Sequence, residues 1–178
     1  MDQGLLPRRY AKALYKFAAE KDFTATVYRL MQNISVAFEK HEQLQHAIAN
    51  PFVPEEEKQK LIMTAAGEQN SILADFIKLL AKNNRLDIIR GIALAYAELY
   101  RKENKIHLVE ITSASSLNDA DKKRITDMIE KHIGDATAEY TFQVNPDLIG
   151  GFVVRIDNEL LDASVRNELN QLRKTLIP

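Results

Sequence analysis

Hydrophobic residues in the first part of the chain recur at intervals of three and four, the repeat of an amphipathic helix that buries one face. In the first of these stripes, Tyr10, Leu14, Phe17 and Ala18 share one face. Five further stripes follow, separated by short polar or proline-containing segments. We therefore expect six helices, over residues 10–18, 23–38, 41–49, 54–67, 72–80 and 86–100.

Helix start and stop signals support these limits. Asn50-Pro51 ends the third helix, because proline pushes the preceding residue out of the α region. Pro54 followed by Glu55–Glu57 starts the fourth, since proline presets φ and the acids meet the positive end of the helix dipole. Gly67 marks its end.

The helix at 72–80 is unusually apolar, and its hydrophobic residues cover more than one face. Such a helix either lies at the centre of a bundle or buries its outer side against a partner helix. The residues alone leave both alternatives open.

The pattern changes after Asn104. A short run rich in branched residues at 106–111 predicts a strand, and Asn118 begins a helix that Gly134 ends. Residues 140–144 and 152–156 alternate apolar with polar, which predicts two half-buried strands.

Turn chemistry at Asn145-Pro146-Asp147 and the pair Gly150-Gly151 lie between those two strands, so we expect them to form a β-hairpin. The glycines permit positive φ or close backbone packing. A closing helix is expected beyond Asp162, with one apolar face made by Val165, Leu169, Leu172 and Leu176.

These patterns predict a mainly α protein of two domains. Residues 1–104 form a six-helix bundle, and residues 105–178 form a small α+β domain with a β-hairpin. The chain of 178 residues is long enough for one sizeable core or two small ones.

Composition excludes several function classes. Net charge is −1, so no global basic excess favours nucleic acid, and the absence of tryptophan argues against base-stacking platforms. The absence of cysteine excludes disulfides and thiolate chemistry. No apolar run is long enough to span a bilayer, so we expect any membrane association to be indirect, through partners.

Candidate catalytic and metal-binding residues have simpler interpretations. His41 and His46 are five apart, not the four of a metal-binding pair on a helix. Glu55–Glu57 form a favourable first helical turn, and no phosphate-binding loop or nucleophile elbow occurs. We expect no catalytic residue, no metal and no cofactor, and hence a protein that binds other proteins.

Three stretches resemble the delta subunit of rotary ATP synthases, whose mitochondrial counterpart is the oligomycin-sensitivity-conferring protein. They are RYAKAL at 9–14, FIKLLAKNNRL at 76–86, and NPDLIGGFVVRI at 145–156 continuing through LDASVRNEL at 161–169. Many family members carry glycine where this chain has Ala163, a mild departure.

The resemblance implies a non-catalytic stator connector, with a six-helix domain facing the catalytic sector and an α+β domain facing the peripheral stalk. It implies location at the cytoplasmic face of the bacterial cell membrane, held there through the complex. The groove for an alpha-subunit N-terminal helix would include Tyr10, Ala13, Leu14, Asp75, Phe76, Leu79 and Leu86. The stalk b subunits would contact the region of Gly150, Gly151, Val165, Leu169 and Leu172.

The alternative is a helical adaptor of another assembly, for example an RNA-associated one. It would require salt-dependent RNA binding, which the near-neutral charge disfavours. An enzyme is less favoured still, because no acid–base constellation is present.

Overall fold

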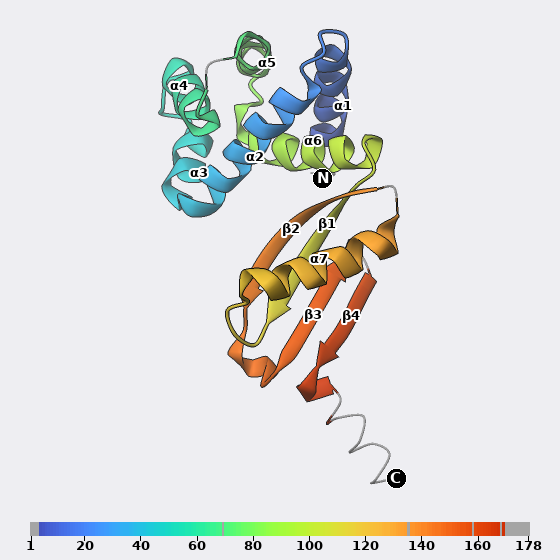
Figure 1. The fold of residues 1–178 in the computed structure, drawn as a ribbon. Helices are drawn as coiled ribbons and strands as arrows, with labels where there is room; N and C mark the ends of the chain where they lie inside the picture. The colour runs from blue at the N-terminus through green and yellow to red at the C-terminus, as the bar shows by residue number, and fades with distance from the viewer. Residues whose placement is uncertain (1–3, 69, 135, 158, 168, 170–178) are drawn as a thin grey trace. The chain divides into compact units, whose positions relative to one another are not determined.

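The computed structural model describes residues 4–167 and 169, apart from 69, 135 and 158. It divides into two compact units, Met1–Glu103 and Asn104–Pro178 (Figure 1). Each unit has its own hydrophobic core, and each is described by itself. The chain is mainly helical with one small sheet, as the pattern predicts.

The N-terminal unit is entirely helical in its described residues. Its elements are α1 (Leu5–Ala19), α2 (Thr24–Lys40), α3 (Glu42–Ala49), α4 (Glu55–Ala66), α5 (Ser71–Lys82), the 3₁₀ helix η1 (Leu86–Ile88) and α6 (Ile89–Glu103). The expected sixth helix is thus interrupted at its start. Asn84, at φ 52°, reverses the chain after α5, and one 3₁₀ turn precedes α6.

Local signals begin and end these helices. Pro54 is the N-cap of α4, followed by three glutamates, and Gly67 ends it in the left-handed conformation at φ 81°. The N-cap of α5 was not predicted. There the side-chain oxygen of Asn70 accepts hydrogen bonds from the backbone N–H groups of Ile72 and Leu73, at 2.9 and 3.2 Å.

The core of this unit is built around α6, which packs against both α1 and α2. Tyr96 of α6 is fully buried, and its hydroxyl donates to the carbonyl oxygen of Thr24 at 3.1 Å. Burial raises the pKa of Tyr96 far above its usual value, because the phenolate would lose its hydration. The hydroxyl therefore stays protonated and keeps its hydrogen bond.

The apolar helix α5 buries most of its hydrophobic residues in this core. Those residues are Ile72, Leu73, Phe76, Ile77, Leu80 and Ala81. Leu79 lies on a different edge and is 48% exposed. The hydrophobic residues of α5 therefore cover more than one face, because one face is buried in the core and Leu79 lies on an exposed edge.

The C-terminal unit packs one helix on one face of a four-stranded sheet (Figure 1). Its elements are β1 (Ile106–Ser113), α7 (Asp119–Ile133), β2 (Thr137–Val144), the 3₁₀ helix η2 (Pro146–Leu148), β3 (Gly151–Ile156) and β4 (Glu159–Ser164). The strand order is β2-β1-β3-β4. The start and end signals of α7 are confirmed: the side chain of Asn118 accepts from the N–H of Asp121 at 2.8 Å, and Gly134 is the C-cap.

The predicted hairpin between 140–144 and 152–156 is wrong. Both segments are strands, but β1 lies between them, parallel to β2 and antiparallel to β3. The helix α7 supplies the crossover that parallel strands need. Alternation predicts that a segment is a strand, but it does not predict which neighbour the strand pairs with. The hairpin of this unit joins β3 to β4 instead.

The strand β4 was not predicted, and the closing helix begins after it. The described backbone is helical at Val165–Asn167, and the hydroxyl oxygen of Ser164 accepts from the N–H of Asn167 at 3.2 Å, as an N-cap does. Leu172 and Leu176, expected on this helix, lie outside the described residues.

In the described part of the chain, no helix is both long enough and apolar enough to cross a bilayer.

Candidate functional site

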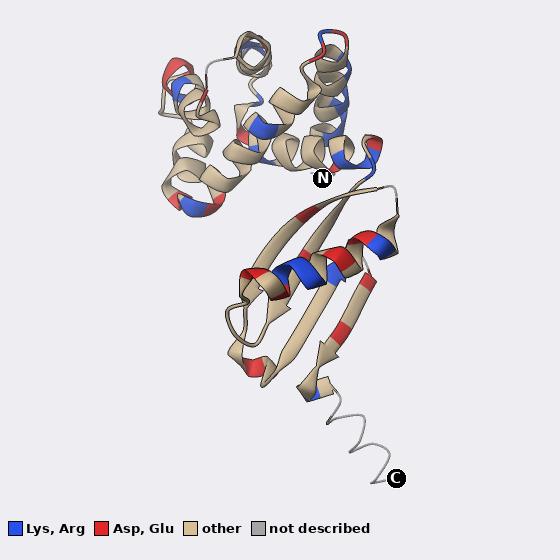
Figure 2. Cartoon of the chain, in the orientation of Figure 1, with Lys and Arg blue, Asp and Glu red and all other residues tan. Residues whose placement is uncertain are grey.

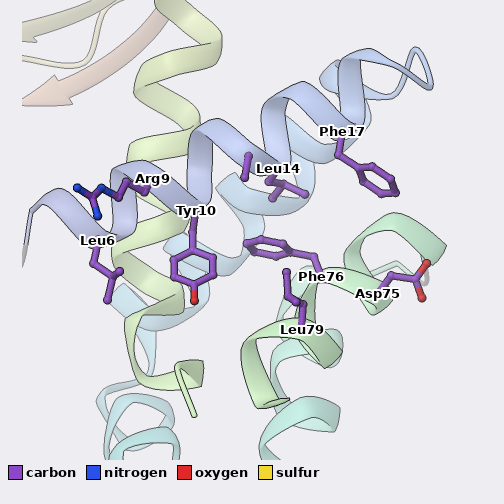
Figure 3. A pocket seen from close by; sticks show the side chains of 9 residues that line it. Leu6, Arg9, Tyr10, Leu14, Phe17, Asp75, Phe76 and Leu79 are labelled. Carbon is purple, nitrogen blue, oxygen red and sulfur yellow. The ribbon is translucent and has the colours of Figure 1, made fainter. Parts of the chain in front are cut away.

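An open groove of about 670 Å³ lies between α1 and α5 (Figure 3). Its lining is mainly apolar and aromatic. The lining residues are Leu6, Arg9, Tyr10, Ala13, Leu14, Phe17, Asp75, Phe76 and Leu79. Along α1 these positions extend from Leu6 to Phe17, about three helical turns or ~16 Å at 1.5 Å per residue.

Helical spacing places these side chains in one row. Leu6, Tyr10, Ala13 and Phe17 follow one another at intervals of four, three and four, so they share one edge of α1. Leu14 sits beside this row and is buried, with 2% of its surface exposed. Leu14 and Phe76 thus belong to both the core and the groove, whereas Phe17 and Leu79 line the groove on its exposed side.

The aromatic wall of the groove is held in place by contacts between the two helices. The rings of Tyr10 and Phe76 meet edge to face, with centroids 6.4 Å apart. Asn83, just after α5, donates from its side-chain nitrogen to the hydroxyl of Tyr10 at 3.4 Å. Phe17 and Leu79 remain 38% and 48% exposed. An apolar helix could bury both side chains without displacing either supporting helix.

Two charged residues mark the ends of the groove. Figure 3 shows Arg9 beside Leu6 at one end and Asp75 on the side of Phe17 at the other. Within the described residues, neither Arg9 nor Asp75 forms an ion pair. Both charges are available to a bound partner.

The structure brings together nearly all of the residues that the sequence assigned to this groove. Tyr10, Ala13, Leu14, Asp75, Phe76 and Leu79 line it. Leu86 does not. It is only 5% exposed, because the turn at Asn84 directs η1 back into the core.

Sequence reasoning missed Leu6, Arg9 and Phe17 as lining residues. The spacing of Leu6, Tyr10, Ala13 and Phe17 was the available signal, since one row of a helix faces one neighbour. Phe17 was assigned to the buried stripe, but it lies on the open edge.

In the C-terminal unit, the Gly150-Gly151 pair has a structural role. Gly151 has φ 77°, and a Cβ there would come within 2.3 Å of the carbonyl oxygen of Ala163 on β4. At Gly150 a Cβ would lie 3.0 Å from the side chain of Val165. The carbonyl oxygen of Gly150 accepts a hydrogen bond from the N–H of Val165. The pair thus lets β3 begin tightly against the end of β4.

Hydrogen bonds also order this corner. The hydroxyl and backbone N–H of Ser164 hold the pKa of Asp162 below its usual range, because both stabilise the carboxylate. The N–H of Ser164 lies 3.0 Å from the carboxylate. Val165 and Leu169, which follow, are 38% and 53% exposed.

An apolar surface extends along α7 on the side of β3 and β4. One hollow of about 540 Å³ includes Ile149, Gly150 and Gly151, and a second of about 530 Å³ includes Leu161. Met128 of α7 lines both. Ile149, Leu161 and Met128 are exposed by 70%, 54% and 43%, so a single helix does not cover this side of the sheet.

Among the described residues, no group of three or more His, Asp or Glu side chains could hold a metal ion. His107 pairs with Asp157, Nδ1 to Oδ2 at 2.6 Å, and Asp157 also accepts from the N–H of Leu108 at 3.1 Å. This pair ties the turn between β3 and β4 to β1. The groove between α1 and α5 and the two hollows along α7 are instead suited to binding the apolar side chains of another macromolecule.

Several known proteins resemble this chain along nearly its whole length. The family model described as "ATP synthase delta (OSCP) subunit" matches residues 6–176. The ATP synthase subunit delta of Parabacteroides distasonis is 38% identical over 178 residues, covering 99% of this chain and 98% of the relative. That of Phocaeicola vulgatus is 33% identical, covering 98% and 95%. A chain in the cryo-EM structure of the Toxoplasma gondii mitochondrial ATP synthase hexamer has the same fold, with a TM-score of 0.70 at 21% identity, covering 97% of this chain and 98% of that one.

Proposed function

Since the chain belongs to the ATP synthase delta (OSCP) subunit family, we propose that its α1–α5 groove holds the N-terminal helix of a catalytic-sector alpha subunit. The observation that carries this proposal is the groove itself: an apolar channel about three helical turns long, lined by exposed Phe17 and Leu79.

The chain is a structural, non-catalytic subunit of ATP synthase. It acts in the stator, the part of the machine that joins the catalytic sector to the peripheral stalk. Family membership confirms the resemblance drawn from the three sequence stretches, and it replaces the alternative of an adaptor in another assembly.

The mechanical role explains why a connector needs no chemistry of its own. A rotor driven by ion flow exerts torque on the catalytic ring, and the ring would turn with the rotor unless it were held. Helix-in-groove binding suits this role, because burial of apolar surface contributes about 25 cal/mol per Å² before the costs of association. The subunit must bind both ends tightly enough not to slip.

We assign the N-terminal unit to the catalytic sector and the C-terminal unit to the b subunits of the stalk. For the second contact, the support is the exposed apolar side of α7, β3 and β4 near Gly150, Gly151 and Val165. Leu169 is 53% exposed, and Leu172 lies outside the described residues.

ATP synthase is a membrane-associated complex, and this chain associates with it through other subunits. We place it at the cytoplasmic face of the bacterial cell membrane. No nucleic acid enters this function, which agrees with the net charge of −1.

The groove assignment predicts that Leu79→Asp releases the alpha-subunit segment. The side chain is half exposed, so the protein should still fold, but a charge in the groove would be desolvated by the docked helix. We expect affinity for a synthetic peptide of that segment to fall about 30-fold or more, as for a central interface residue. Titration calorimetry on the full chain measures it.

The matched control is Leu94→Asp on α6, because Leu94 is 52% exposed and does not line the groove. It should bind the peptide as the wild type does. Equal affinity of folded Leu79→Asp and wild type would disprove the groove assignment.

A further inference from the structure

The groove is bordered on one side by a row of positive charges. The helix α1 contains Arg8, Arg9, Lys12 and Lys16 and no acidic residue (Figure 2). Lys12 and Lys16 follow Arg9 by three and seven residues, so the three share one edge of the helix. Arg9 lines the groove, and this edge is therefore its rim.

These three charges are not neutralised within the described part of the chain. All three residues are exposed, and among the described residues none forms an ion pair. Arg8, on another side of α1, differs: it lies 3.9 Å from Glu98 of α6. Like charges at this spacing repel and weaken a helix by a few tenths of a kcal/mol per pair. Lys16 lies in the last turn of α1, where a cation suits the helix dipole, but Arg9 and Lys12 have no such role.

The opposite rim has a different character. The helix α5 carries Asp75 in the groove and Lys82 seven residues later, so both signs occur along that edge. The groove is thus electrostatically one-sided: the charged residues of the α1 rim are Arg9, Lys12 and Lys16, all basic, whereas the α5 edge carries both signs.

We propose that the docked helix carries a row of acidic side chains along the edge that lies against Arg9, Lys12 and Lys16. This inference rests on the proposed function and adds the chemistry by which the partner is recognised. An apolar stripe would fill the groove, and the flanking acids would pair with Arg9, Lys12 and Lys16, which form no ion pair with any other described residue. Charges at the rim of an interface mainly speed association and set its geometry.

The one-sided arrangement also sets the direction of the bound helix. Consider an amphipathic helix with acidic residues on one flank. It can place its apolar face in the groove and its acidic flank against α1 in only one N-to-C direction along the groove. Reversing the helix end to end would turn the acidic flank away from the three basic residues and toward α5, where Asp75 repels it and Lys82 attracts it, so the net attraction would be smaller. The basic row thus serves as an orientation signal.

The test uses the full chain and a variant with Arg9→Glu, Lys12→Glu and Lys16→Glu. The control variant reverses three exposed lysines on other helices, Lys40→Glu, Lys60→Glu and Lys102→Glu, so both have the same net charge. The probe is a peptide of the alpha-subunit N-terminal segment, measured by titration calorimetry at 50 and 300 mM salt. A second pair of probes is a designed helix with a leucine stripe and either glutamates or lysines along one flank.

We expect the α1 variant to bind the alpha segment about 10- to 100-fold more weakly than the wild type at low salt. The control variant should stay within about threefold, and higher salt should reduce the difference. The glutamate-flanked helix should bind the wild type more tightly than the lysine-flanked one. The α1 variant should reverse that preference.

Suppose that the alpha segment binds the wild type. If both variants then lost the same affinity for it, or neither lost any, the basic-row inference would be overturned. Failure of the alpha segment to bind the wild type at all would overturn the proposed docking instead. In that case the designed helices still decide the present inference, because a lack of preference between them would contradict it.

Discussion

Gly151 shows how one residue determines a corner of the C-terminal unit. Its φ of 77° lies in the left-handed region, and its missing Cβ lets the carbonyl oxygen of Ala163 approach. The sequence predicted that the glycine pair would allow positive φ or close packing, and at Gly151 the structure has both. The partner could not be predicted, because β4 lacked a clear alternating pattern.

We expect Gly151→Ala to lower the free energy of unfolding of the C-terminal unit by about 2–4 kcal/mol. The added methyl group would both strain φ and collide with backbone, which cannot move as a side chain does. Urea denaturation followed by amide NMR signals of the sheet measures the loss.

Gly134→Ala separates the two effects. Gly134 also has positive φ, at 65°, but a Cβ there meets nothing within 4 Å. Its substitution should cost only the backbone strain, about 1–2 kcal/mol. If both variants lost the same stability, the close approach to Ala163 would not matter.

For Leu86, the hydrophobic side chain correctly predicted burial, but its place in the sequence did not predict where in the fold it is buried. Its hydrophobic character correctly indicated burial, but it was assigned to the groove. The turn at Asn84 changes the direction of the chain between α5 and η1, so helical spacing cannot be continued across it.

At the scale of elements, α5 contributes side chains both to the hydrophobic core and to the lining of the groove. One face carries Leu73 and Leu80 into the core, and another edge presents Asp75 and Leu79 to the groove. Its N-cap at Asn70 therefore supports both.

Replacing Asn70 with Ala should lower the free energy of unfolding of the N-terminal unit by about 1 kcal/mol, because two backbone N–H groups lose their acceptor. Thermal unfolding followed by circular dichroism measures it. Asn70→Asp keeps a capping oxygen and should stay within a few tenths of a kcal/mol of the wild type. Equal losses for Asp and Ala would show that the cap contributes no stability.

The sheet shows what an element pattern leaves undetermined. The segments that became β1, β2 and β3 were each predicted as strands, yet the pairing expected between β2 and β3 does not occur. Each strand can pair with any other whose exposed and buried faces match. The helix α7 packs on one face of the sheet and brings β2 to the far side of β1.

At the scale of the whole molecule, the described residues of the two units form cores of different size. The N-terminal core includes residues of all six α-helices, whereas the C-terminal core has Val109, Ile111, Ile125, Ile129 and Val154 at its centre. A smaller core leaves less stability after the entropy of ordering the chain.

We predict that residues 1–104 fold without the rest of the chain, since their described residues form a hydrophobic core of their own. Circular dichroism should show a cooperative helical unfolding transition for this fragment. Its affinity for the alpha-subunit peptide should be within about threefold of the full chain, because the groove residues all lie in this unit. A fragment that folds but does not bind would place part of the docking site outside the groove.

The sequence pattern predicted the six α-helices of the N-terminal unit and α7, β1, β2 and β3, but not β4, and it located the change of character near residue 104. These properties follow from local periodicity and capping chemistry, which act over a few residues. It also indicated most of the groove-lining residues, through the family resemblance. The strand order, the burial of Leu86 and the places of Arg9 and Phe17 in the groove became known from the three-dimensional structure alone. Each of these depends on which distant segments pack together, and packing is decided by the shape of the whole core.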